Sequence, residues 1–65
     1  MQIGDVFYVK KNAYGDEWNG WPMVVEDIYD NNRIRMRYQN QSDGSHNTIT
    51  YSLDKINEHL EKEVT

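Results

Sequence analysis

The strongest structural signal in this chain is the strict alternation of polar and apolar residues in RIRMRYQ, Arg33–Gln39. Successive side chains of a β-strand point to opposite faces of a sheet, so a period of two predicts a strand with one wet face and one core face. The predicted wet face carries Arg33, Arg35, Arg37 and Gln39, and the predicted core face carries Ile34, Met36 and Tyr38. A strand of this kind requires neighbouring strands, so the chain is expected to build a sheet.

Three other segments are predicted to supply the neighbours. Residues 5–11, 22–30 and 48–52 are rich in β-branched or aromatic side chains. Pro22 suits the first position of its strand, where it interrupts no ladder. Residues 30–33 are expected to form a tight hairpin turn, since asparagine tolerates the left-handed conformation that two-residue turns require. Residues 12–20 and 40–47 read as polar loops.

The end of the chain changes to helical periodicity. Apolar residues recur at Leu53, Ile56, Leu60 and Val64, and Ser52 can act as the N-cap. The pattern predicts a helix over residues 53–63. A one-turn helix over residues 53–56, followed by a last strand, is the alternative.

Size and composition limit what the fold can use for stability. The 65 residues, treated as one domain, contain no cysteine, so disulfides and thiolate metal sites are excluded. His46 and His59 have no companion cluster, so no metal and no cofactor are expected. No apolar run approaches a membrane span, and the N-terminus lacks the pattern of a signal peptide, which predicts a cytoplasmic protein.

Four short strands joined by loops describe an antiparallel meander, which at this size usually curls into a small barrel. The predicted fold is therefore mainly β, an SH3-like antiparallel barrel of four to five strands with a short C-terminal helix. The opening residues GDVFYV, followed after a loop by WPMVV, resemble the start of the PemK/MazF-type toxins and of PWWP domains. The first resemblance implies RNA cleavage and the second implies binding of methylated lysine and DNA. Trp21 stands where the toxins carry an arginine, so no catalytic residue is carried over.

The aromatic residues are the first candidates for a site. A concave surface for a peptide, a polyproline helix or a cation would use Tyr8, Tyr14, Trp18, Trp21 and Tyr38. The competing interpretation is that they serve only as core and loop anchors in a very small protein. Trp21, beside Pro22 at a strand entry, is expected to be mainly structural, whereas the loop residues Tyr14 and Trp18 are better placed for contact.

The arginines form the second candidate. Arg33, Arg35 and Arg37 would project from one strand face at about 6.6 Å intervals, close to the spacing of phosphates in an extended single strand. The alternative, favoured by the net charge of −4, is that they meet acids of the neighbouring strand. Adjacent acids such as Glu26 and Asp27 should face opposite ways, so no catalytic carboxylate pair is expected.

The chain is therefore predicted to be a non-catalytic protein-binding module, not an enzyme. Asp16, Glu17, Glu26 and Asp27 would supply an acidic rim that attracts a basic partner protein. A small acidic accessory or inhibitory protein of a phage or mobile element is one form of this expectation, with a monomer or weak homodimer as its state. Single-stranded nucleic-acid binding through the arginines and a reduced toxin-like ribonuclease remain the alternatives.

Overall fold

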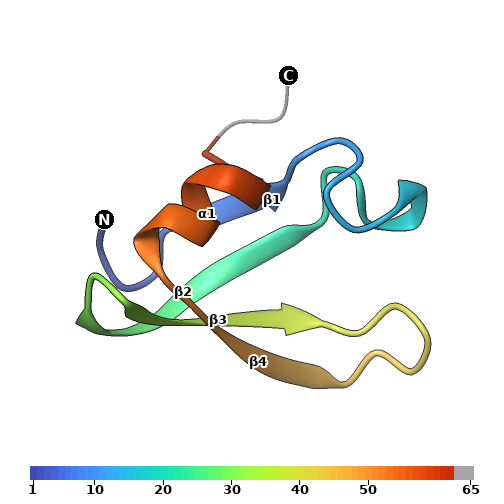
Figure 1. Cartoon of the computed structure of the whole chain (residues 1–65). Helices are drawn as coiled ribbons and strands as arrows, with labels where there is room; N and C mark the ends of the chain where they lie inside the picture. The colour runs from blue at the N-terminus through green and yellow to red at the C-terminus, as the bar shows by residue number, and fades with distance from the viewer. Residues whose placement is uncertain (63–65) are drawn as a thin grey trace.

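A computed structural model, described over residues 1–62, contains a single antiparallel sheet of five strands with the order β4-β3-β2-β1-β5 (Figure 1). One short 3-10 helix and one α-helix complete the fold. The elements in chain order are β1 (Val6–Val9), η1 (Asp16–Trp18), β2 (Pro22–Asp30), β3 (Arg33–Gln39), β4 (His46–Tyr51), α1 (Leu53–His59) and β5 (Leu60–Glu61). The prediction of a mainly β fold with a short helix near its C-terminal end is confirmed.

The predicted strands are all present, with some changes at their ends. β2 and β3 have the predicted bounds, and β3 buries Ile34 and Met36 while Arg33 and Arg37 are exposed. β1 is shorter than predicted, and β4 begins two residues earlier than predicted, at His46. The β3–β4 loop is shorter than expected because residues 46 and 47 continue the ladder with β3.

The turn between β2 and β3 is stabilised by different interactions from those predicted. The described chain has one non-glycine residue with positive φ, Asn12, so neither turn asparagine adopts the left-handed conformation. Instead, Asp30 accepts hydrogen bonds from the Asn32 N–H at 2.8 Å and from the Arg33 guanidinium at 3.0 Å. These contacts lower the pKa of Asp30, the Asn32 N–H being the larger cause. The side chain of Asp30 thus takes over the role assigned to asparagine backbone geometry.

The helix is shorter than predicted. It begins as expected, with the Ser52 hydroxyl accepting from the Lys55 N–H at 3.2 Å, but it ends at His59 rather than at residue 63. Leu60 adopts an extended conformation, pairs with Val9 of β1 and is 3% exposed. The helix therefore ends before Leu60, because this residue is buried in the core as part of β5. The alternative of a short helix followed by a strand is closer to the structure, although the helix continues past Ile56. Residues 63 and 64 lie outside the described residues.

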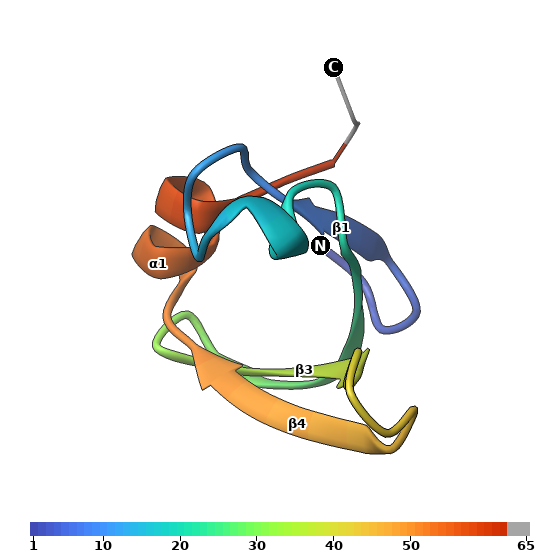
Figure 2. The ribbon, with the colours of Figure 1, turned by 90° about the vertical axis from the view of Figure 1, so that its right-hand side faces the viewer.

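The core lies in the concavity of the curled sheet. Figure 2 shows β1 and α1 on one side and β3 and β4 on the other, so the sheet bends around the space between them. This space is filled by nine buried residues: Phe7, Val9, Met23, Val25, Ile34, Met36, Tyr51, Ile56 and Leu60. The core has no buried polar or charged residue, so apolar packing is its main source of stability.

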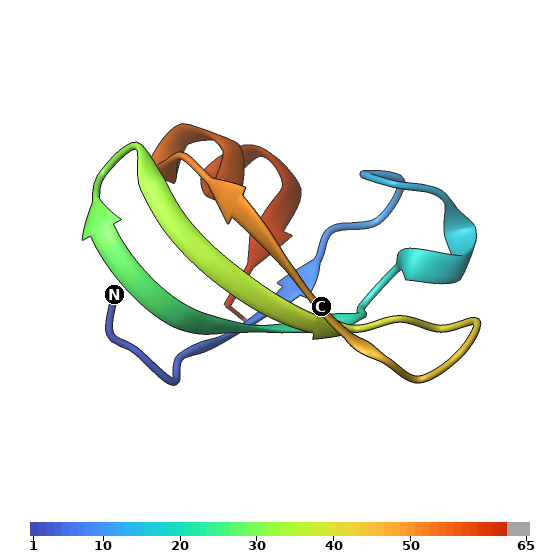
Figure 3. The same ribbon diagram turned by 90° about the horizontal axis from the view of Figure 1, so that it is seen from below.

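Two loops project from the same end of the molecule, namely the β1–β2 loop and the β3–β4 loop (Figure 3). They are joined by a hydrogen bond from the Gln41 side-chain amide to the Glu17 carbonyl. Over residues 1–62, none of the helices is both long and apolar enough to cross a bilayer. The same residues include no cluster of three His, Cys, Asp or Glu side chains arranged to hold a metal ion.

Candidate aromatic groove

The β1–β2 loop is an ordered structure that fixes Trp18. Its base is closed by hydrogen bonds from the Gly20 N–H to the Val9 carbonyl at 2.9 Å and from the Val9 N–H to the Trp21 carbonyl at 3.0 Å. Gly15 precedes η1 with φ +107° and ψ 160°, a conformation that is essentially restricted to glycine. The 3-10 turn that follows directs Trp18 against the core, where it is half-buried.

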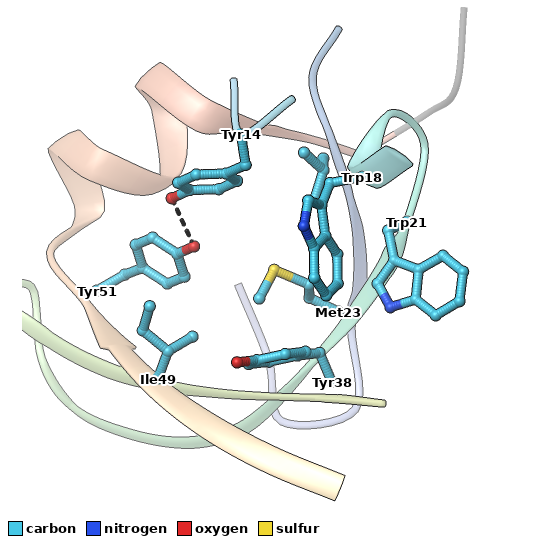
Figure 4. Close-up of a pocket in the computed structure, with 8 residues that line it drawn as sticks. Tyr14, Trp18, Trp21, Met23, Tyr38, Ile49 and Tyr51 are labelled. Atoms are coloured by element: carbon cyan, nitrogen blue, oxygen red, sulfur yellow. Dashed lines mark hydrogen bonds between the residues drawn. The ribbon is translucent and has the colours of Figure 1, made fainter. Parts of the chain in front are cut away.

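Eight side chains from five parts of the chain, namely four strands and the β1–β2 loop, line a groove at this end of the sheet, which we call the aromatic groove. They are Val9, Tyr14, Trp18, Trp21, Met23, Tyr38, Ile49 and Tyr51. Val9, Met23 and Tyr51 are buried and form its base, whereas Tyr14 and Ile49 are 42% and 38% exposed. Figure 4 shows the open space between Tyr14 and Tyr51 on one side and Trp18 and Tyr38 on the other. The groove has a volume of about 210 Å³ and is lined by no charged side chain.

The rings on one side of the groove support each other edge to face. The Trp18 ring centroid lies 5.8 Å from that of Trp21 and 5.9 Å from that of Tyr38, with interplanar angles of 87° and 83°. Trp21 is anchored further by its indole N–H, which donates to the Gln39 carbonyl at 2.9 Å. These contacts hold the rings in fixed orientations, so little side-chain freedom remains to be lost on binding.

The other side of the groove contains a pair of tyrosine hydroxyls. Tyr14 and Tyr51 are joined through their hydroxyl oxygens at 2.7 Å, and the Tyr14 ring lies 5.1 Å from the His59 ring. Burial raises the pKa of the Tyr51 hydroxyl above the ordinary tyrosine value, and the hydrogen bond with Tyr14 raises it further. The Tyr51 hydroxyl is therefore neutral at physiological pH, and the two hydroxyls satisfy each other's hydrogen-bonding capacity.

The structure brings together four of the five predicted aromatic residues. Tyr14, Trp18, Trp21 and Tyr38 line the groove, but Tyr8 does not. Tyr8 lies between the buried residues Phe7 and Val9 on β1, so alternation directs it to the opposite face of the sheet. Tyr8 therefore does not share the groove with the other four rings, a separation that the strand period of β1 already indicated.

Sequence reasoning missed the residues that complete the groove, which are Val9, Met23, Ile49 and Tyr51. Ile49 and Tyr51 pair with Met36 and Ile34, and so share the core face of β3. The alternation in TITY was the available signal, but only the strand register shows which face meets the loop aromatics. Trp18 differs from the prediction in degree, because it is half-buried against the core rather than free in the loop.

Only part of the predicted acidic rim lies beside the groove, because Glu26 and Asp27 pair with Arg35 instead. Asp16 and Glu17 occupy the same 3-10 turn as Trp18, and both are exposed. This turn contains no basic residue. Within residues 1–62 neither the Asp16 nor the Glu17 carboxylate forms an ion pair, so both remain exposed beside the apolar surface.

The arginine face is largely neutralised by the neighbouring strand. Arg33 contacts Asp30 at 3.0 Å, and Arg35 contacts Glu26 at 3.2 Å and Asp27 at 3.8 Å. The expectation that Glu26 and Asp27 face opposite ways was wrong. β2 shifts register between Val25 and Asp27, and this β-bulge at Glu26 lets both carboxylates reach one guanidinium.

Arg37 differs from the other two arginines. Within residues 1–62 it has no carboxylate within 4 Å. It borders a second hollow of about 260 Å³, which is lined by Trp21, Pro22, Val24, Arg37, Tyr38, Gln39 and His46. Trp21 and Tyr38 thus belong to the walls of both hollows.

The aromatic groove is lined by apolar and neutral polar groups. It offers ring faces, a thioether, aliphatic side chains, the Tyr38 hydroxyl, and the hydroxyls of Tyr14 and Tyr51, which bond to each other. Its lining includes no carboxylate, imidazole or amine, and such a lining is suited to apolar side chains. Comparisons with protein-family models, with curated proteins and with solved structures find no match for this chain.

Proposed function

We propose that this chain is a non-catalytic protein-binding module and that the aromatic groove receives side chains of its partner. The observation that carries the proposal is the partly exposed apolar lining, with Tyr14 and Ile49 above a buried base. Tyrosine and tryptophan dominate the energetics of protein interfaces because they bury a large area at a small cost in side-chain entropy. In this role the rings would act as preorganised anchors.

The proposed scaffold is an SH3-like barrel. The strand order β4-β3-β2-β1-β5, the long loop between β1 and β2 and the short helix before β5 support this assignment. The strong curl of the sheet in Figure 2 supports it as well. In such a scaffold the two loops at one end are natural carriers of a recognition site, because a rigid sheet positions them.

The size and charge of the groove suggest the kind of partner. A volume of about 210 Å³ suits one or two side chains better than a large cofactor. The exposed Asp16 and Glu17 would attract lysine or arginine beside those anchors. We therefore propose a basic protein segment with an aromatic or aliphatic anchor as the partner, and an accessory or inhibitory role for this acidic chain.

Selection from a displayed library of random peptides would test the proposal. Peptides selected on the unaltered chain are expected to combine basic residues with an apolar anchor, and their binding can be followed through the fluorescence of Trp18 and Trp21. Tyr14→Ala should weaken the selected peptides at least about tenfold, as expected for the loss of an interface anchor. Ile49→Thr should weaken them less, because it removes less apolar area.

The chain offers matched controls for both variants. Tyr29 is 52% exposed and Ile28 is 37% exposed, and neither lines the groove. Tyr29→Ala and Ile28→Thr should therefore leave peptide affinity unchanged. Equal losses for groove and control variants, or selected peptides that ignore Tyr14→Ala, would contradict the proposed function.

Nucleic-acid binding remains a second candidate, supported by Arg37 alone. Arg37 lines the second hollow together with Trp21, Tyr38 and His46, a combination suited to a phosphate and a stacked base. Salt-dependent binding of single-stranded RNA or DNA that is lost in Arg37→Ala, but not in Arg33→Ala, would favour this function. Absence of binding at low salt would eliminate it, and the same RNA incubations would reveal any cleavage.

A further inference from the structure

The outer edge of β4 carries backbone groups that the sheet does not use. The Asn40 N–H donates to the Ser45 carbonyl at 2.7 Å, one step beyond the Gln39–His46 pair of the β3–β4 register. Bonded and non-bonded pairs alternate along an antiparallel ladder, so Asn47, Ile49 and Tyr51 bond to β3. The N–H and C=O groups of His46, Thr48 and Thr50 must then point away from β3.

No described strand pairs with the outer edge of β4, which is the last strand in the sheet order. α1 follows β4 and contacts it, and Figures 1 and 2 show α1 at the end of β4 that leads into it. His46, Thr48, Ile49 and Thr50 are all exposed. The opposite edge differs, since β5 has two residues and is followed by Lys62, a short and charged edge that resists pairing.

β4 also lacks the features that normally block an edge. Its sequence, HNTITY, contains no proline, lysine or carboxylate, and its register with β3 has no bulge. Uninterrupted edges with β-branched residues are templates for a further strand. The strand itself has no formal charge, so no like charges of β4 meet when two copies of this edge approach each other.

We propose that β4 pairs antiparallel with β4 of a second copy of this chain, which joins the two sheets across a twofold axis at Ile49. In this register Thr48 of each copy bonds to Thr50 of the other through their outward-pointing backbone groups. Ile49 faces its own copy as a non-bonded pair, with Cα atoms about 4.5 Å apart. The contact covers an isoleucine that is 38% exposed in the single chain.

The dimer does not require the proposed peptide binding, but it shares Ile49 with the aromatic groove. Ile49 and Tyr51 line the aromatic groove, so the pairing sets the two grooves side by side on one face of the joined sheet. A partner with two anchor segments would then gain from divalent attachment. A dimer that failed to form would leave the groove of each chain intact.

Sedimentation velocity from micromolar to millimolar protein tests the pairing. The unaltered chain should shift from 7.8 kDa towards twice that mass as its concentration rises. Thr48→Pro removes an N–H that β3 does not use, so it should keep the fold by circular dichroism and remain a monomer. Thr48→Val keeps the N–H and should still dimerise. A monomeric unaltered chain throughout this range, or a Thr48→Pro variant that still dimerises, would overturn the proposal.

Single cysteine variants test the register without relying on the proline. The chain has no cysteine of its own, so Ile49→Cys places one thiol at the twofold axis. Under mild oxidation it should form a covalent dimer at least about tenfold faster than Ile28→Cys, because only its Cα separation fits a disulfide. Ile28 has a similar exposure, 37%, but lies on β2. Equal rates for the two variants would overturn the Ile49 register.

Discussion

The arginine face of β3 and the aromatic groove are two candidate sites with opposite environments in the structure. Arg33 and Arg35 on the outer face meet carboxylates of the hairpin within 4 Å. On the inner face, Tyr14 and Ile49 keep 42% and 38% of their surface exposed. The charges are satisfied within the fold, whereas much of the apolar surface is not.

This difference shows that exposure has separate meanings for charged and apolar groups. A solvated or paired arginine is stable at a protein surface and needs no ligand. Exposed rings above a buried base keep apolar surface in contact with water. This contact is unfavourable, and a partner that covers the rings would remove it. The groove is therefore the better candidate site, even though the arginine alternation is the clearer sequence pattern.

The largest effect on stability is expected at Trp18, which lines the groove and also packs against the core. Trp18→Ala should lower the free energy of unfolding by about 2–3 kcal/mol, below the cost of a fully buried tryptophan because the ring is half-buried. Urea denaturation measures this loss, and Trp18→Phe should recover much of it. A loss under about 0.5 kcal/mol would mean that Trp18 is a free contact residue.

A smaller effect is expected at Gly15, which shapes the loop beneath the groove. An added Cβ would lie 3.2 Å from a Glu17 carboxylate oxygen, in a backbone conformation that other residues avoid. Gly15→Ala should therefore cost about 1–2 kcal/mol in urea denaturation. Asp16→Ala, one residue further along, should cost under about 0.5 kcal/mol because Asp16 is exposed. Equal costs would indicate that the loop conformation is not fixed by Gly15.

Alkaline titration tests whether the Tyr51 hydroxyl on one side of the groove is buried and hydrogen-bonded to Tyr14. The pKa of Tyr51 is raised in the folded protein, so its contribution to stability is complete below the unfolded value of about 10 and declines as the pH rises above it. Absorbance at alkaline pH should show one of the five tyrosines ionising only with unfolding. Tyr51→Phe should remove that late step, and its persistence would assign the delayed ionisation to another tyrosine.

The smallest effects are expected on the arginine face. Arg35→Met should cost no more than about 1 kcal/mol, because its ion pairs with Glu26 and Asp27 are partly exposed and screened. Arg37→Met should be nearly neutral in stability. A double-mutant cycle of Arg35→Met with Glu26→Gln, measured at low and high salt, should give a small coupling that salt reduces. A salt-independent coupling would show that the pair is more buried than its exposure indicates.

Several parts of the fold were accessible from local sequence. The alternation in β3, the proline at the start of β2 and the Ser52 cap each involve residues close in the chain, and each prediction was correct. The errors arose where distant residues compete with local preference. Leu60 leaves the helix to pack beside Val9, and Glu26 forms a bulge in the pairing of β2 with β3.

The candidate site shows the same division. Tyr14, Trp18, Trp21 and Tyr38 could be selected from the sequence as large rings in or beside loops. The alternation of β1 could also have separated Tyr8 from them, but nothing local added Tyr51. By itself the sequence determined a small β protein with one wet and one apolar face to its central strand, because side-chain alternation is a property of the strand. Tertiary structure alone decided which rings share a groove, which arginines find acids and which strand edge stays open, because those outcomes depend on register and curvature between segments far apart in the chain.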